Sequence, residues 1–242
     1  MRRVFREPRR ILAGSVALLI PAAALASVPQ QVVPVASELG TPTFTAPVSS
    51  SSETTGSTAS TSYDGAWGTS DAYQSMLNQS YGADAVAAAQ AAGINPDTLA
   101  AFGQIESHFQ NVGNSTSSAN GVWQITNGTW DQYASKLGLS SADRSDPAAQ
   151  AKVASAIISD YSAAVSRATG TAATGTQVYG AYMFGTKAGA EIATEKNAST
   201  PLSAFVSSST LAANHMSGWT VGQYQQTVAQ RMGSGASEAV TG

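Results

Sequence analysis

The chain has no cysteine, and charged residues make up only 11% of its 242 positions. Without cysteine no disulfide scaffold can form, so a folded domain must be held together by its core alone. The two histidines, His108 and His215, do not cluster with acidic residues, which argues against a metal site. Strand patterns are almost absent as well, so we predict a mainly α fold.

The first 26 residues have the pattern of a secretory signal peptide. Basic residues between positions 2 and 10 precede an apolar run, Ile11 to Ile20, and Ala24-Leu25-Ala26 fits the small-residue cleavage pattern. The apolar run is too short to span a membrane comfortably. We therefore expect cleavage near Ala26, export of the chain and no transmembrane segment in the mature form.

Cleavage at that point would make the protein more acidic. The leader contains five arginines and one glutamate, so seven basic and fourteen acidic residues would remain, a formal net charge of −7 against −3 for the whole chain. An acidic surface repels polyanions. Nucleic acid and anionic lipid are therefore poor candidates as partners.

Composition divides the remaining chain into three parts. Residues 27–69 are rich in Ser, Thr and Pro with few large apolar side chains, which predicts a flexible linker. Residues 70–232 are about the size of one domain. Residues 233–242 are small and polar, and we expect a disordered tail there.

The domain has helical periodicity throughout. Apolar spacing and capping residues predict helices over residues 71–80, 83–92, 96–108, 127–137, 147 to about 167, 176–184, 188–196 and 221–232.

The helix at 96–108 carries the most informative residue, Glu106. Leu99, Phe102 and Gly103 lie three to seven positions before it, so its carboxylate falls on or beside the apolar face. An apolar environment disfavours the charged form and raises the pKa of a carboxyl group. That is the property a general acid needs near neutral pH.

The segment after Glu106 suggests what the acid acts on. A loop rich in Asn, Ser and Thr, residues 110–120, leads into Gly121-Val122-Trp123-Gln124-Ile125. An acid, a polar loop and a strip with aromatic and amide side chains together indicate a cleft for a sugar chain.

Residues 104–130 resemble the catalytic core of the soluble lytic transglycosylases, relatives of goose-type lysozyme. Fifteen positions separate Glu106 from Gly121, the spacing usual in that family. The matching positions are Glu106-Ser107-His108-Phe109, Ser115, Ala119, Gly121, Gln124-Ile125 and Thr129.

The chain also departs from the family pattern. Ser118 replaces a glycine, Val122 and Trp123 replace Leu-Met, and Asn127 replaces a proline. The later Ala-Tyr-Asn motif becomes Ala181-Tyr182-Met183, so its asparagine is lost. Residues 184–189 are similar to divergent members found in phage particles and secretion systems, which makes a cell-envelope assembly a candidate partner.

The resemblance implies a lysozyme-like helical domain that cleaves peptidoglycan glycan strands in the periplasm or outside the cell. Glu106 would protonate the oxygen between N-acetylmuramic acid and N-acetylglucosamine. It would then act as base toward the C6 hydroxyl of the same sugar, which closes a 1,6-anhydro ring. This chemistry needs no second carboxylate, metal or cofactor.

The resemblance also assigns supporting roles. Ser115 would hydrogen-bond near Glu106, while Gln124 and Tyr182 would contact the substrate or hold the acid in place. Trp123 would either stack on a sugar or fill the core, and packing is the favoured interpretation.

Two alternatives remain open. A lysozyme-type hydrolase of the same fold would use Glu106 with an activated water. A non-catalytic cell-wall-binding protein would retain the fold without the activity. The altered Leu-Met and Ala-Tyr-Asn motifs favour it slightly, whereas the retained Glu106, Ser115 and Gln124 argue against it.

Overall fold

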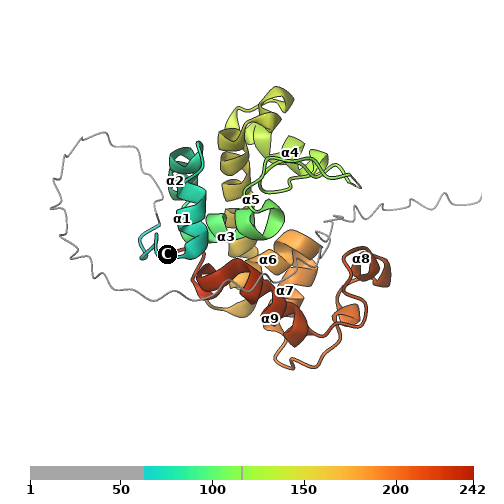
Figure 1. Ribbon diagram of the computed structural model, residues 1–242. Helices are drawn as coiled ribbons and strands as arrows, with labels where there is room; N and C mark the ends of the chain where they lie inside the picture. Colours follow the sequence, from blue (N-terminus) through green and yellow to red (C-terminus); the bar gives the residue numbers. More distant parts are fainter. Residues whose placement is uncertain (1–62, 116) are drawn as a thin grey trace, which may run out of the picture.

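The computed structural model describes residues 63–115 and 117–242 (Figure 1). The predicted signal peptide and residues 27–62 of the predicted linker lie outside this part. The described residues form nine α-helices and four short 3₁₀-helices, with isolated β-bridges and no strand, which confirms the mainly α prediction.

The helices follow the predicted order closely. The α-helices are α1 (Asp71–Leu77), α2 (Gly82–Ala91), α3 (Pro96–Ser107), α4 (Asn127–Ala134), α5 (Pro147–Thr169), α6 (Gly175–Phe184), α7 (Thr186–Thr194), α8 (Ser208–Ala213) and α9 (Val221–Met232). The 3₁₀-helices are η1 (Ser135–Leu137), η2 (Ser141–Ser145), η3 (Leu202–Ala204) and η4 (Gly233–Ser237).

Local capping explains the helix bounds. The Asn95 side chain accepts a hydrogen bond from the amide of Asp97, and Pro96 opens α3. Asp146 caps α5 in the same way, and Gly170 ends it in the left-handed conformation. Helix α8 was not predicted, since six residues are too few to show a period.

Helix α3 lies at the centre of the domain and contacts α1, α2, α5, α6 and α9. Its Leu99 and Phe102 are fully buried. Helices α6 and α7 pack with their backbones in contact, because a Cβ at Gly189 would lie only 2.2 Å from the amide nitrogen of Ala181. The small residues of this chain therefore serve close helix packing.

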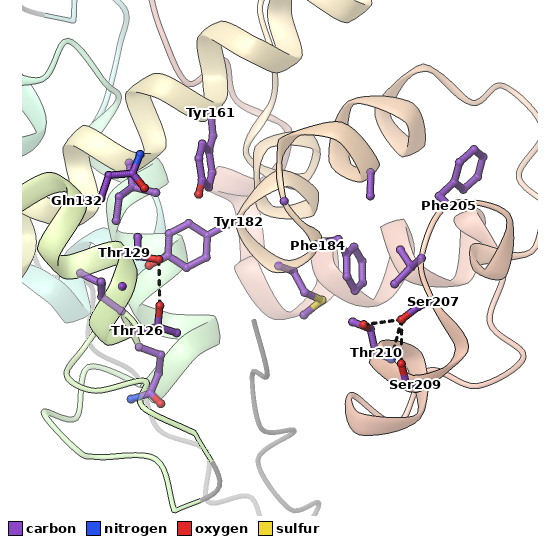
Figure 2. Close-up of a pocket in the computed structure, with 18 residues that line it drawn as sticks. Thr126, Thr129, Gln132, Tyr161, Tyr182, Phe184, Phe205, Ser207, Ser209 and Thr210 are labelled. Carbon is purple, nitrogen blue, oxygen red and sulfur yellow. Dashed lines mark hydrogen bonds between the residues drawn. The ribbon is translucent and has the colours of Figure 1, made fainter. Parts of the chain in front are cut away.

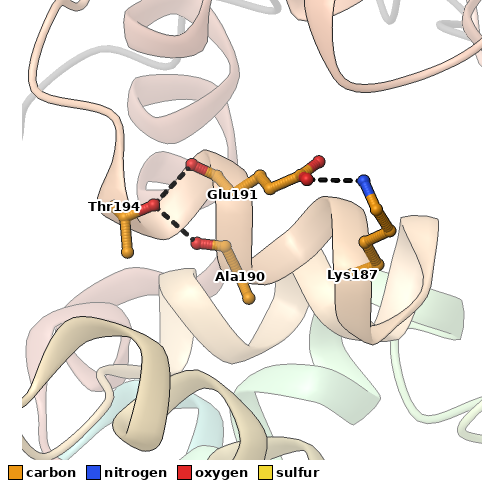
Figure 3. Close-up of polar contacts among 4 residues, drawn as sticks. All are labelled: Lys187, Ala190, Glu191 and Thr194. Atoms are coloured by element: carbon orange, nitrogen blue, oxygen red, sulfur yellow. Dashed lines mark hydrogen bonds and ion pairs between the residues drawn. The ribbon is translucent and has the colours of Figure 1, made fainter.

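Charge contributes little to this architecture. Among the described residues a single ion pair meets the distance criterion, between Lys187 and Glu191 at 2.5 Å, one turn apart on the exposed side of α7 (Figure 3). Exposed pairs of this kind contribute roughly 0–1 kcal/mol. Apolar packing must therefore supply most of the stability.

Residues 233–242 form part of the fold, so the prediction of a disordered tail is wrong. Val240 is fully buried, and its carbonyl accepts a hydrogen bond of 2.8 Å from the amide of Asn95. The amide of Gly175 donates to the carbonyl of Glu238 at 3.2 Å. These two bonds attach the segment to the starts of α3 and α6, which compensates for its lack of large apolar side chains.

The ordered chain also begins before residue 70, where the predicted linker ended. Tyr63 is buried, and the amide of Gly68 donates to the Asp97 carboxylate at 2.8 Å. The Ser70 hydroxyl donates to the same carboxylate at 2.9 Å and also caps α1. Residues 63–69 therefore belong to the domain, held by the first turn of α3.

Among the helices formed by the described residues, none combines the length and the apolar character needed to cross a bilayer.

Candidate active site

Glu106 lies in the last turn of α3, directly before an abrupt change of chain direction. His108 and Phe109 both adopt left-handed backbone conformations, with φ of 53° and 63°. Such conformations are costly outside glycine and persist only where neighbouring contacts hold them. Here the Phe109 ring is buried, and the Tyr81 hydroxyl donates to the Phe109 carbonyl at 3.0 Å. The turn fixes where α3 stops and thus where Glu106 stands.

Gly103, one turn before Glu106, permits this arrangement. A Cβ there would lie 3.0 Å from the Phe109 ring and 3.4 Å from the indole nitrogen of Trp123. The absent side chain lets both aromatic rings approach the helix.

Both carboxylate oxygens of Glu106 are buried and have no hydrogen-bond partner among the described residues. Burial raises the pKa of Glu106 to about 8. The Tyr179 hydroxyl acts in the opposite direction, but it remains outside hydrogen-bonding geometry, so burial dominates. The side chain is therefore protonated at neutral pH, as the apolar helix face predicted.

Three tyrosines surround this carboxyl group. Burial raises the pKa of Tyr179, Tyr182 and Tyr224, and the proximity of Glu106 raises each of them further. The buried Tyr224 hydroxyl also has no hydrogen-bond partner among the described residues. Residues from α3, α6 and α9 thus form one buried group of weak acids.

A cleft of about 640 Å³ lies beside this group (Figure 2). One wall comes from α4 and the loop before it, and the opposite wall from α8 and the loop that precedes it. Hydroxyl pairs occupy both walls: Thr126 with Thr129 at 3.0 Å, and Ser207 with Thr210 at 2.8 Å. Aromatic rings are also present, and none of the lining residues in the described part of the chain is charged. Amides, hydroxyls and aromatic rings without charge suit a neutral carbohydrate.

Tyr182 belongs both to the cleft and to the surroundings of Glu106. It lines the cleft, whereas Glu106 is not among the lining residues. The Tyr182 hydroxyl donates to the carbonyl of Trp123 at 2.6 Å, and its ring packs edge-on against Phe102. Tyr182 therefore forms the wall between the cleft and the acid, and its role in contacting the substrate or holding the acid in place stays a prediction.

Gln124 lines the cleft and also fixes the loop that forms it. Its backbone is left-handed, with φ of 46°, and the residue is buried, with only 5% of its surface accessible. The amide nitrogen donates to the carbonyls of Val112 and Gly121 at 2.9 and 2.8 Å. Both predicted roles, support and cleft contact, are compatible with this position.

Trp123 is a core residue. It is fully buried, its indole nitrogen donates to the carbonyl of Leu99 at 2.9 Å, and its ring packs against Tyr81. The alternative of a sugar-stacking platform is wrong for this structure, because no face of the ring reaches the cleft. Its carbonyl, by contrast, orients Tyr182.

Ser115 does not meet Glu106. It is exposed on the loop before Gly121 and is not among the residues that line the cleft. The Glu106 oxygens have no hydrogen-bond partner among the described residues, so Ser115 does not hydrogen-bond to the acid itself.

Sequence reasoning missed two residues that brace the loop of residues 110–126. A Cβ at Gly121, where φ is 86°, would lie 2.3 Å from the Gln150 side chain, whose oxygen accepts from the Val122 amide at 2.9 Å. Arg144 donates to the carbonyls of Ser118 and Ile125, each at 2.6 Å. No local pattern marks either residue, since both act across 19 or more positions of sequence.

Tyr179 and Tyr224 were missed as well. Both lie on the apolar faces of predicted helices, and nothing in their spacing distinguishes them from ordinary core residues. Only the packing of α6 and α9 on α3 brings them to Glu106. The described residues contain no group of three or more His, Asp or Glu side chains placed to hold a metal ion.

Comparison with known proteins finds a family that matches the central part of the chain. No curated protein matches it. The family model described as "Transglycosylase SLT domain" matches residues 85–201, a span that includes α3, the loop of residues 110–126, α6 and α7. Such a domain implies activity of the lytic transglycosylase type on peptidoglycan. Residues 85–201 therefore match the soluble lytic transglycosylase family, which the motifs of residues 104–130 predicted.

Proposed function

We propose that this protein cleaves the β-1,4 bond between N-acetylmuramic acid and N-acetylglucosamine and forms a 1,6-anhydro end, with Glu106 as acid and then as base. The observation that carries the proposal is a carboxyl group with a pKa of about 8, buried beside an uncharged cleft and without a hydrogen-bond partner among the described residues.

In the first step protonated Glu106 gives its proton to the glycosidic oxygen. The bond from C1 to that oxygen breaks, and positive charge develops on C1 and the ring oxygen. A pKa of about 8 keeps most of the acid protonated at neutral pH. Positioned acid–base catalysis of this kind contributes roughly 10²–10⁴-fold to rate.

In the second step the C6 hydroxyl of the same sugar attacks C1. Its proton passes to the Glu106 carboxylate, which returns the enzyme to its starting state. Glycosidases that use water or a covalent intermediate rely on a second carboxylate at a set separation. None of the described residues that line this cleft is a carboxylate, and this favours the intramolecular route over the lysozyme-type alternative.

Reaction requires the sugar to reach Glu106. A proton donor must come within about 2.6–3.2 Å of its acceptor, but the carboxyl group lies behind Tyr182. We infer that glycan binding displaces this wall. Gly185, with φ of 85° between α6 and α7, lines the cleft beside it and provides a junction at which the two helices can shift.

Other residues near Glu106 and the cleft have supporting roles in this proposal. Tyr179 and Tyr224 are poised to hydrogen-bond the Glu106 carboxylate once it has given up its proton. The hydroxyls of Thr126, Thr129 and Thr210 contact the glycan. We assign Ser115, which is exposed on the loop before Gly121, to substrate contact.

A peptidoglycan substrate places the protein outside the cytoplasm, in the periplasm or secreted. Cleavage of the predicted signal near Ala26 belongs to this proposal. We also propose a cell-envelope assembly as a partner, on the ground of the family resemblance.

Mass spectrometry of muropeptides released from purified peptidoglycan tests the proposal, with Glu106→Gln in parallel. Anhydro-ended products that vanish in the variant are expected. Reducing-ended products would make the protein a lysozyme. Absence of products from folded protein, together with sedimentation on peptidoglycan, would favour the wall-binding alternative.

A further inference from the structure

A second hollow, of about 850 Å³, lies on another side of α5 from the cleft and is bounded by α2 and the α4–η1 segment. We call it the alanine groove. The residues that line it are Asp84, Ala87, Ala88, Ala91, Ala92, Tyr133, Lys136, Leu137, Ala148, Lys152, Ala156, Ser159 and Asp160.

Small side chains form the walls of the alanine groove. On α2, Asp84, Ala87, Ala88 and Ala91 recur at intervals of three and four, so they form one face of the helix. Ala87 and Ala91 are exposed, and Leu137 keeps 42% of its surface accessible. Methyl groups at this spacing leave a shallow apolar channel suited to a narrow chain with small side chains.

Charges of both signs surround that channel. Lys136 and Lys152 supply two ammonium groups, and Asp84 and Asp160 supply two carboxylates, all on exposed side chains. The Lys136 nitrogen lies 5.1 Å from the centre of the Tyr133 ring, which orients it over the groove wall. The cleft, by contrast, has no charged side chain among the described residues that line it. The groove therefore suits a ligand that carries both carboxylates and an amino group, which a neutral glycan does not.

The alanine groove and the cleft share a wall. Gln132 lines the cleft and Tyr133 the groove; likewise Tyr161 lines the cleft and Asp160 the groove. Burial raises the pKa of Tyr133, and Asp160 and Tyr161 raise it further, so these three groups lie close together. The two hollows are thus separated by neighbouring side chains of α4 and α5.

We propose that the alanine groove binds the stem peptide of peptidoglycan while the cleft holds the glycan strand that carries it. A stem peptide is a short chain of alternating L and D residues, rich in alanine, with free carboxylates and often one amino group. Five extended residues span about 16–18 Å, which exceeds the roughly 10 Å diameter of one helix. A peptide attached to a sugar in the cleft is therefore long enough to cross the shared wall. This inference rests on the proposed function for the identity of the substrate.

Direct binding tests the groove without requiring catalysis. The probe is a free synthetic stem pentapeptide that contains a diamino acid, titrated into the full-length Glu106→Gln protein and followed by amide NMR shifts. We expect shifts on α2, η1 and the middle of α5. Double charge reversal, Lys136→Glu with Lys152→Glu, should weaken binding about tenfold or more, because it turns two attractions into repulsions. Lys196→Glu, an exposed lysine outside both hollows, is the matched control and should bind as the parent does.

A second variant tests the shape of the groove rather than its charge. Ala91→Phe places a ring in the channel at an exposed helix position, so folding should be retained, and peptide binding should be lost. Unchanged affinity in both Ala91→Phe and the charge-reversed protein, or no shift at all with the parent, would overturn the proposal. Shifts confined to the cleft would overturn it as well.

Cleavage supplies a separate readout. Rates are compared on strands that retain their stem peptides and on strands from which an amidase has removed them. The ratio of the two rates should fall at least fivefold in the charge-reversed protein. An unchanged ratio would contradict the groove assignment and leave the proposed function intact. Absence of cleavage of either substrate by the wild-type protein would instead count against the proposed function, and the binding titration would still decide the groove.

Discussion

Helix α3 carries a buried carboxyl group at each end, and the two are treated in opposite ways. Asp97, in the first turn, is fully buried and accepts hydrogen bonds from the Gly68 amide and the Ser70 hydroxyl at 2.8 and 2.9 Å. Glu106, in the last turn, is buried with no partner among the described residues, and its pKa rises to about 8. A buried carboxylate that accepts hydrogen bonds stabilises the fold, whereas a buried carboxyl group without hydrogen-bond donors keeps its proton at neutral pH.

The ends of the helix contribute to this difference. Exposed amide groups and the positive end of the helix dipole favour a carboxylate at the first turn, and the last turn disfavours one. The same side-chain chemistry therefore serves stability at residue 97 and reactivity at residue 106.

The largest expected effect is the loss of activity when Glu106, in the last turn of α3, is changed. Glu106→Gln keeps the size of the side chain but removes the transferable proton, so cleavage should fall by about 10³-fold or more. Release of muropeptides from purified peptidoglycan measures it. Asp97→Asn is the matched control, since it also converts a carboxylate to an amide on α3, and folded Asp97→Asn protein should retain activity. Equal losses of activity in Glu106→Gln and Asp97→Asn would contradict the assignment of a catalytic role to Glu106 and a structural role to Asp97.

Glu106→Gln should make the protein more stable above about pH 5, although it lowers the activity. The folded pKa of Glu106, about 8, lies above the ordinary value of 4.5, so the folded state binds a proton that the unfolded state releases between these values. Folding is therefore progressively disfavoured as pH rises through that window. Glu106→Gln should exceed the wild type in unfolding free energy by an amount that grows by up to about 4 kcal/mol between pH 5 and pH 8. Urea denaturation at the two pH values checks this, and a difference that does not vary with pH would count against a buried neutral acid.

Removing the carboxylate at the first turn should destabilise the protein. Asp97→Ala leaves the Gly68 amide and the Ser70 hydroxyl without their buried acceptor, at a cost of about 3 kcal/mol. A chain that begins at residue 71 lacks those donors and should lose a similar amount. Combining the two changes should add little further, because they remove the same interaction. Additive losses would show that Asp97 has a separate role.

The smallest of these effects is the pH dependence of the wild-type rate. Activity should persist through neutral pH and fall about tenfold per unit above pH 8, as the acid loses its proton before it can act. Initial rates on a soluble glycan between pH 5 and pH 10 measure this decline in activity. A decline that begins near pH 5 would indicate that Glu106 has an ordinary pKa.

Local signals in the sequence predicted most of the helices and the apolar environment of Glu106. They did not predict the hydrogen-bonded environment of Asp97. The caps Asn95 and Asp146 and the apolar spacing around Phe102 are short-range features, so α3 and α5 were found with nearly correct bounds. The raised pKa of Glu106 followed from the same helical face.

Long-range pairing accounts for what the sequence did not reveal. The tie between Asp97 and Ser70 spans 27 positions, and the burial of Val240 depends on its bond to Asn95. Tyr224 reaches Glu106 only because α9 packs on α3. Trp123 was ambiguous for the same reason, since a tryptophan in a polar loop has no local mark of a core residue.

Residue-resolved titration of the Glu106 carboxyl group tests the central claim most directly. Carbon-13 NMR of the side-chain carboxyl, assigned by its absence in Glu106→Gln, gives the midpoint without any substrate. A midpoint near 8 would establish a buried acid that is protonated at neutral pH. A midpoint near 4.5, the ordinary value for glutamate, would contradict the account and leave Glu106 as a solvated carboxylate at the end of a helix.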